Sequence, residues 1–346
     1  MKNISLILCV LTLFSCSKND VVPEEITNPL LNPKWCITEG PLPTGAESPY
    51  PLMNNPIFKN VNEITTLLDR HRVAIVSFNN VIKVYPYLFN NKFEIVNDVI
   101  GDRYYAVSYC PLTKTAINYN RVIKDEPIDL IASGYLYKDN MVPSDTQFNY
   151  FWSQMLMKGI NNGAKAQNIG TYNIIQTTWK TVVDYFPTAK VFYLEGVGTP
   201  VTEAMNQNST ETKSKSTGNE DPDDVYAIIE HYGSQTREEI VHSYSFDRFD
   251  DGVSMRHVSI GGDDTILIGS SEHYFFTTYN VPPGVAFLEI DKNIFPPVLS
   301  DINGNKWNAF GYAFEGPRKG EQLTSPKSYV AAWWAWKSFY KNILIK

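Results

Sequence analysis

Cysteine and histidine are scarce in this chain, which limits the disulfides and metal sites that the sequence can form. Four cysteines and five histidines occur among 346 residues. We expect Cys9 to be removed with a signal peptide and Cys16 to carry a lipid, so Cys36 and Cys110 are the only pair that could form a disulfide in an oxidising compartment. The spacing of these residues matches no zinc site. We therefore predict no cofactor and assign no metal ligand, and a bound metal stays an alternative that the sequence does not support.

Blocks of positive charge are also absent. The chain carries 30 Lys and Arg against 37 Asp and Glu, which gives a formal net charge of −7. Proteins that bind nucleic acid usually carry a basic patch or stripe, so we exclude nucleic acid as a partner. The chain is long enough for one large domain or two ordinary domains with a hydrophobic core, so its stability need not depend on disulfides.

The most apolar run stands at the start of the chain. Residues 1–16 read MKNISLILCVLTLFSC, in which Lys2 precedes an apolar run from Ile4 to Phe14. This is the layout of a secretory signal, and the run is shorter than the roughly 20 residues that a transmembrane helix needs. Leu13-Phe14-Ser15-Cys16 resembles a lipobox. We therefore predict that residues 1–15 are removed as a signal peptide and that Cys16 is lipidated.

A lipid on Cys16 would determine where the protein resides. Residues 16–40 then comprise the lipidated cysteine and a flexible tether, because this stretch has little to bury. The tether resembles those of Bacteroidetes lipoproteins. We expect an extracytoplasmic protein that is anchored to the outer membrane by its lipid. It would lie on the periplasmic or the cell-surface face of that membrane.

Two parts of the body repeat the same order of residues. The first copy contains Ser144-Asp145, Trp152, Gly159-x-x-x-Gly163 and Trp179-Lys180, and the second contains Ser300-Asp301, Trp307, Gly316-x-x-x-Gly320 and Trp336-Lys337. The second glycine and the last tryptophan lie 16 positions apart in both copies. We predict two pseudo-repeats, residues 41–200 and 225–346, joined by a polar linker at 201–224 within one compact body.

Hydrophobic periodicity predicts a β-rich α+β fold, in which each repeat has several strands followed by an amphipathic helix that carries tryptophan. Apolar residues at helical spacing predict helices over 175–186 and 332–340. Asn79-Asn80 between two β-type runs predicts a hairpin, because asparagine tolerates positive φ. The predicted strands cover residues 73–78, 81–85, 104–109, 115–119, 129–137, 265–268, 273–279 and 285–290.

A series of motifs in the first half resembles a known family. The residues are Val84-Tyr85-Pro86, Glu94-Ile95-Val96-Asn97-Asp98, Gly101, Ser108-Tyr109-Cys110-Pro111-Leu112, Ala116, Ser133-Gly134, Leu136-Tyr137 and Trp152-Ser153-Gln154. In this order they resemble the bacterial domain of unknown function 3179, over roughly Pro41 to the end of the chain. The resemblance implies no particular activity, because none is established for that family.

The chain departs from the family pattern at two reactive positions. Members typically read HEIVND and CPLCG, whereas this chain has Phe93 in place of the histidine and Thr113 in place of the second cysteine, followed by Lys114. A dithiol cycle needs a second sulfur, and a metal site needs several thiolate or imidazole ligands. If the family uses such chemistry, the resemblance implies that this chain has lost or altered it.

The candidate pocket combines residues of these motifs, namely Cys110, Glu94, Asn97, Asp98, Ser133 and Gly134. The alternatives are a buried structural cysteine at 110 and ordinary turn hydrogen bonding by Asn97 and Asp98. We favour a non-catalytic binding or assembly lipoprotein with an unknown ligand or protein partner, and we assign no catalytic residue. One alternative is a thiol- or metal-dependent enzyme or metal carrier that uses Cys110 with Glu94 and Asp98. Another is a surface glycan-binding protein that uses the many aromatic residues.

Overall fold

The computed structural model describes residues 33–37, 39–44, 50–165, 167, 169–197, 224–230, 239–249 and 252–346. The protein is β-rich, with 47% strand and 9% helix, which confirms the predicted β-rich fold. Within these residues, no helix is both long and apolar enough to cross a membrane. The predicted leader, Cys16 and most of the predicted linker at 201–224 lie outside the described residues, although Asp224 itself begins a strand.

The predicted hairpin is the first paired unit of the main sheet. Strands β3 (Arg72–Phe78) and β4 (Val81–Pro86) pair antiparallel, with Phe78 opposite Val81. The two residues between them, Asn79 and Asn80, have φ values of 49° and 63°. Positive φ at both central residues is what the type I′ form of a two-residue hairpin turn requires, and asparagine adopts it more readily than bulky or β-branched residues do. The hairpin prediction is therefore confirmed.

The sheet built on this hairpin has the order β15-β3-β4-β16-β2. The added strands are β2 (Phe58–Asn60), β15 (Ile175–Thr178) and β16 (Lys190–Phe192). Strand β16 runs parallel to β4, and the other neighbours are antiparallel. Helix α2 (Trp179–Tyr185) follows β15, and the Thr178 hydroxyl caps it by accepting from the Thr181 N–H. The predicted helix start at 175 is wrong, because β-branched residues at 175–178 pair with β3 instead.

A second sheet has the order β25-β17-β18-β26. Its strands are β17 (Asp224–Glu230), β18 (Ile240–Ser245), β25 (Ser328–Ala332) and β26 (Asn342–Ile345). Helix α4 (Trp333–Phe339) connects β25 to β26, which runs parallel to β18. Four strands of each sheet therefore share their order and pairing directions. Trp179 and Trp333 each begin a helix, so Trp179 occupies the same position in its helix as Trp333 does. The spacing in the sequence had instead matched Trp179 with Trp336.

Each of these sheets is accompanied by a three-stranded meander. The first consists of β5 (Ile95–Ile100), β6 (Arg103–Cys110) and β7 (Thr115–Asn120), and β14 (Thr171–Tyr172) pairs with β7. The second consists of β19 (Ser254–Ile260), β20 (Asp263–Ser270) and β21 (Phe275–Asn280). The residue before the last strand of each meander, Lys114 or Tyr274, has positive φ, 57° and 46° respectively. The strand predicted at 285–290 is wrong, because only an isolated bridge at Phe287 forms there.

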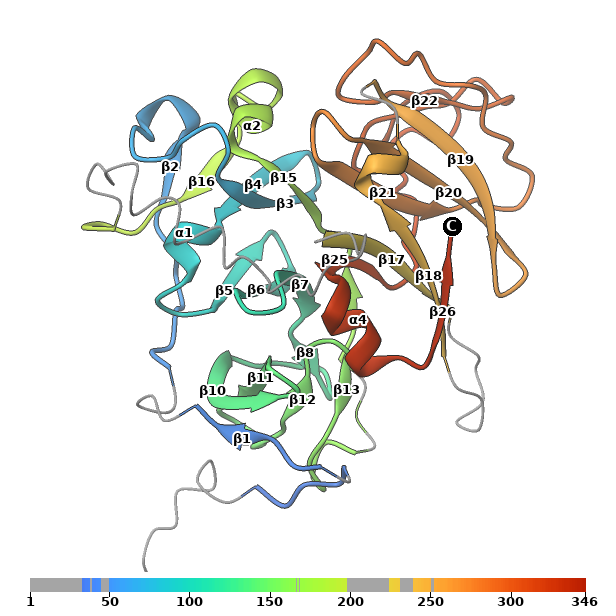
Figure 1. The fold of residues 1–346 in the computed structure, drawn as a ribbon. Coiled ribbons are helices and arrows are strands. Elements are labelled where there is room, and N and C mark those ends of the chain that lie inside the picture. Colours follow the sequence, from blue (N-terminus) through green and yellow to red (C-terminus); the bar gives the residue numbers. More distant parts are fainter. Residues whose placement is uncertain are drawn as a thin grey trace, which may run out of the picture.

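The remaining elements are short and lie around these sheets. They are β1 (Leu42–Pro43), η2 (Val61–Glu63), α1 (Tyr87–Asn90), β8 (Val122–Ile123), β9 (Glu126–Pro127), β10 (Leu130–Tyr137), β11 (Asn140–Asp145), β12 (Trp152–Ser153), β13 (Lys158–Gly159), η3 (Phe246–Arg248), β22 (Leu299–Ser300), β23 (Lys306–Trp307) and β24 (Ala313–Glu315). Strands β1, β10 and β11 form one small sheet, drawn below β5–β7 in Figure 1.

The hydrophobic core is continuous across the boundary between the two halves. One buried cluster joins Trp179 of the first half to Trp307 of the second, and another joins Trp152 to Trp336. Strand β25 contacts β7, and β15 contacts β21, so each half packs against the meander of the other. We call the line along which the halves meet, near β15, β17 and β25 in Figure 1, the seam.

Candidate functional site

Cys110 ends strand β6 and is almost completely buried, with 1% of its surface exposed. Burial raises the pKa of its thiol, and hydrogen bonds from Thr113 oppose this effect only in part. Cys36 and Cys110 are both free. The Cys36 sulfur instead lies 4.0 Å from the Gly159 carbonyl oxygen. The disulfide that the sequence permitted is therefore not formed in the structure.

Glu94, another residue of the candidate pocket, lies beside Cys110. The Glu94 carbonyl accepts a 2.8 Å hydrogen bond from the Tyr109 N–H, which fixes Glu94 next to the end of β6. Burial raises the pKa of Glu94 to about 7. Its charge in turn helps to raise the pKa values of Cys110 and Tyr50. Glu94 also has a φ of 58°, an uncommon and strained conformation for a residue with a side chain.

Asn97 is a structural link and not a pocket residue. Its amide nitrogen donates to the Met53 and Leu130 carbonyls at 3.1 and 2.8 Å. Its amide oxygen accepts from the Leu130 N–H at 2.9 Å. The side chain thus ties β5 to β10 with its hydrogen bonds made inside the protein, as a buried amide requires.

Asp98 lies far from Cys110 along the sheet. It is paired with Tyr105, five residues before Cys110 on β6, and a rise of about 3.3 Å per residue puts roughly 16 Å between them. The Asp98 Oδ2 accepts hydrogen bonds from Lys83 Nζ, Tyr85 OH and Tyr105 OH at 2.7, 2.6 and 2.7 Å. The structure therefore separates Asp98 from the proposed pocket with Cys110.

Ser133 and Gly134 form an irregularity in strand β10. The pairing of β10 with β11 shifts between Ala132 and Leu136, and Gly134 has a φ of 78°, which glycine adopts without strain. The Ser133 hydroxyl donates to the Val142 carbonyl at 2.6 Å. These two residues have a structural role as a β-bulge, which re-aims the strand.

A buried polar network behind Cys110 was not recognised from the sequence. The Asn140 amide donates to Thr113 Oγ1 at 2.9 Å and to Gln154 Oε1 at 2.6 Å, and Gln154 Nε2 donates to Ser108 Oγ at 2.9 Å. All four side chains are fully buried. Gln154 and Ser108 belong to the quoted motifs, but Asn140 carried no signal. The network ties the turn after Cys110 to β11 and β12, with Thr113 as one of its acceptors.

A second group, the seam cluster, comprises Arg72, Tyr87, Tyr109, Lys114, Asp224 and Tyr274. Lys114 Nζ lies 2.9 Å from Asp224 Oδ1, and Tyr274 OH donates to Asp224 Oδ2 at 2.7 Å. The Arg72 guanidinium lies over the Tyr274 ring, and the Tyr109 ring stacks on Tyr87 at 3.7 Å. Burial raises the pKa values of Tyr87, Tyr109 and Tyr274. The cluster adjoins the pocket residues, because Cys110 also helps to raise the pKa of Tyr109.

The seam cluster forms where the turn of each meander meets the other half. Arg72 and Asp224 are the first residues of β3 and β17, and the turn residues Tyr274 and Lys114 contact them. The neighbouring backbones are joined in the same way. The Thr113 carbonyl accepts from the Ala332 N–H at 2.8 Å, and the His273 carbonyl accepts from the Thr177 hydroxyl at 2.6 Å.

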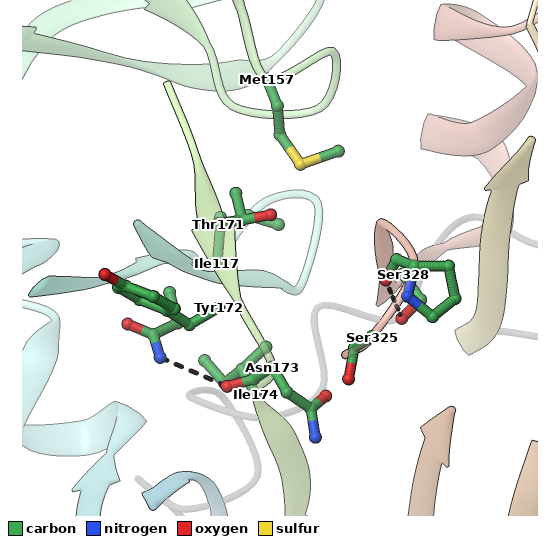
Figure 2. Close-up of a pocket in the computed structure, with 10 residues that line it drawn as sticks. Ile117, Met157, Thr171, Tyr172, Asn173, Ile174, Ser325 and Ser328 are labelled. Carbon is green, nitrogen blue, oxygen red and sulfur yellow. Dashed lines mark hydrogen bonds between the residues drawn. The ribbon is translucent and has the colours of Figure 1, made fainter. Parts of the chain in front are cut away.

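A cavity further along the seam is too small to be the functional site. In Figure 2, Thr171, Tyr172 and Asn173 line it on one side and Ser325 and Ser328 on the other. Its volume is about 10 Å³, about the space of one water molecule, whereas sites for small organic ligands are usually hundreds of cubic ångströms. Among the described residues, no group of three or more His, Cys, Asp or Glu side chains is placed to bind a metal ion.

Comparison with known proteins identifies a family. Residues 49–343 match the model of a family described as Protein of unknown function (DUF3179). No curated protein and no solved structure matches the chain. The family match covers most of the chain, from before Tyr50 to the last strand, and includes every residue of the seam cluster. The chain therefore belongs to the DUF3179 family.

Proposed function

We propose that this chain is an exported, lipid-anchored binding or assembly protein, and that the region around Cys110 and the seam cluster binds a partner without catalysing a reaction. The observation that carries the proposal is the state of Cys110. Its thiol is buried and the pKa of this thiol is raised. Thr113, at the other side of the turn, offers a hydroxyl and not a second thiol. Because the thiolate is the nucleophile and the metal ligand, this environment favours a structural thiol.

Thiol labelling tests this proposal directly. The test uses the mature chain, residues 16–346 with Cys16→Ser. With Cys36→Ser added, we expect Cys110 to resist a water-soluble disulfide reagent at neutral pH and to react fully after unfolding in denaturant. Cys110→Ser in place of Cys36→Ser is the matched control, because it leaves only the partly exposed Cys36. Rapid labelling of folded Cys110 would refute the proposal of an inert thiol.

The proposed anchor is the lipid on Cys16. Its support is the order of the leader, with Lys2, an apolar run and a lipobox-like Leu13-Phe14-Ser15-Cys16. The tether's resemblance to those of Bacteroidetes lipoproteins supports an outer-membrane location. Labelled palmitate should enter the wild-type protein and not the Cys16→Ala variant, and the wild type should fractionate with the outer membrane. Equal labelling of the two chains would contradict the assignment.

We also propose that residues 41–200 and 225–346 descend from one duplicated unit. The support is that β15, β3, β4 and β16 repeat the order and directions of β25, β17, β18 and β26, and that each sheet has a similar meander. Superposing the first sheet, its meander and α2 on their counterparts should align all of them with one rotation. Alignment of the meanders alone would argue against duplication.

The second candidate is a thiol- or metal-dependent role, and the proximity of Glu94 to Cys110 favours it. Two ligands are few for a metal, and Asp98 is too distant to be the third. Metal analysis of protein from its own host tests this candidate, since bound metal that disappears in Cys110→Ala would support it. For glycan binding, Trp152, Trp307 and Trp336 are fully buried, which leaves few tryptophans for a sugar-stacking surface.

A further inference from the structure

We propose that the seam cluster binds an anionic ligand, and that a carboxylate or phosphate group of this ligand pairs with the guanidinium of Arg72. This inference rests on the proposed binding function and gives the chemical class of the ligand. A guanidinium presents five N–H donors in a planar fork that matches the oxygens of a carboxylate or phosphate.

The first argument is that Arg72 has a buried donor for which the described residues offer no acceptor. Its guanidinium lies over the face of the Tyr274 ring, and its Nη1 is shielded from solvent and has no hydrogen-bond partner among those residues. In the part of the chain that the structure describes, no carboxylate forms an ion pair with it. Asp224, the acid of the cluster, forms its ion pair with Lys114 through Oδ1, which accepts no hydrogen bond from the described residues, and accepts from Tyr274 through Oδ2. Donors that are buried without acceptors destabilise a protein, so an external acceptor would be favoured.

The second argument is that Tyr109 offers another donor near Arg72, whose charge opposes part of the rise in the pKa of Tyr109. Within the described residues its hydroxyl makes no hydrogen bond, whereas that of its stacking neighbour Tyr87 donates to Gln176. Burial raises the pKa of Tyr109, so the hydroxyl keeps its proton at neutral pH. Both Arg72 and Tyr109 remain partly exposed, so the cluster reaches the surface of the protein.

The third argument is the charge of the cluster. Arg72 and Lys114 are positive and Asp224 is negative, so these three residues leave one positive charge uncompensated. The Tyr274 ring, itself stacked on Phe246, covers one face of the Arg72 guanidinium and lowers the local dielectric constant there, which strengthens its attraction for an anion. A carboxylate or a phosphate would supply the missing negative charge and accept from the free donors.

Thermal shift and calorimetry on the mature chain, residues 16–346 with Cys16→Ser, test the inference. The probes are sodium benzoate and inorganic phosphate at constant ionic strength, with benzamide as the neutral analogue of benzoate. We expect at least one anion to raise Tm and benzamide to have no effect. A response to benzoate alone identifies a carboxylate, and a response to phosphate alone identifies a phosphate.

Variants locate the effect. Arg72→Gln should weaken binding of the effective anion by about tenfold or more, and Tyr109→Phe should weaken it less while keeping the ring stack. Arg103→Gln is the matched control, because Arg103 also lies over aromatic rings, those of Phe78 and Tyr172, outside the cluster. If Arg72→Gln fails to fold, Tyr109→Phe against Arg103→Gln decides the matter.

The inference is overturned if neither anion binds, or if binding persists unchanged in Arg72→Gln and Tyr109→Phe. These results leave the proposed function standing as long as folded Cys110 resists labelling. Anion binding together with a rapidly reacting Cys110 would have the opposite meaning, since it would support this site and refute the inert thiol on which the proposed function rests. The two proposals can therefore fail separately.

Discussion

The two main sheets share a strand order but differ at their outer edges. In the first sheet, β2 pairs with the outer side of β16, and Val191 of β16 is fully buried. In the second sheet, no described strand pairs with the outer side of β26, and Ile345 is 63% exposed. Because unpaired edge strands invite association with other chains, the comparison teaches that a shared topology does not ensure shared edge protection.

The largest expected effect is the loss of stability when Trp336 is replaced, and its unfolding curve shows whether the two halves unfold together. Trp336 is fully buried, stacks on Tyr329 and donates to the Val225 carbonyl, and Tyr329 donates to the Met155 carbonyl across the seam. Trp336→Ala should lower the free energy of unfolding by about 4 kcal/mol. Urea unfolding followed by circular dichroism should show one shifted transition. The control Trp334→Ala, partly exposed on the same helix, should cost less, and two separate transitions would show independent halves.

The next effect compares the two edges directly. Phe58 of β2 packs edge-on against Tyr85 and Phe192 under the ammonium of Lys83. Because Phe58 is only half-buried, Phe58→Ala should cost about 2 kcal/mol, below the range for a core aromatic residue. Ile345→Ala at the open edge should change stability by less than about 0.5 kcal/mol. Equal losses in urea titrations of the two variants would mean that β26 is covered as well as β16 is.

A third comparison is between Glu94, which directly precedes β5, and Ser254, which begins the corresponding strand β19. Burial raises the pKa of Glu94 from its ordinary value of 4.5 to about 7, so the folded state binds this proton more tightly than the unfolded chain does. The ionised group therefore costs stability progressively as the pH rises from about 4.5 to 7, and fully above 7. Glu94→Gln should stabilise the protein by about 2 kcal/mol at pH 8 and by almost nothing at pH 4.

Chemical unfolding at a series of pH values measures this difference. Ser254→Ala is the control, because Ser254 stands opposite Gly269 as Glu94 stands opposite Tyr109 and has no charge to lose. Its effect should be independent of pH over the same range. A constant difference between Glu94→Gln and wild type would show that Glu94 is not desolvated.

The smallest effect compares the two meander turns. Lys114 and Tyr274 both have positive φ, where glycine is less strained than alanine. Lys114→Gly should be more stable than Lys114→Ala by about 1 kcal/mol, since both variants lose the ion pair to Asp224 and only glycine removes the strain. The same order is expected for Tyr274→Gly and Tyr274→Ala. An inverted order at either turn, measured by thermal unfolding, would show that the two turns are not equivalent.

Local signals predicted the parts of the fold that local chemistry governs. Asn79-Asn80 specified a hairpin, because two adjacent residues with positive φ are sufficient to reverse the chain. The tryptophan helices were located, but the start of α2 was displaced because β15 pairs with β3. For the site, shared motifs grouped Glu94 with Cys110, which the fold brings together. The same motif suggested that Asp98 also lies near Cys110. Nearness in the sequence cannot show this, because each further residue along a strand moves the side chain away from Cys110.

By itself, the sequence determined a β-rich body and its family. It also showed that the turn after Cys110 has Thr113 in place of a second cysteine. Only the tertiary structure decided that this thiol is buried against a polar network and that Arg72, Tyr109, Asp224 and Tyr274 meet at the seam. Those residues are up to about 200 positions apart, and no periodicity or spacing connects them. Their contacts arise because each meander turn docks on the other half, and docking depends on the shape of the whole core.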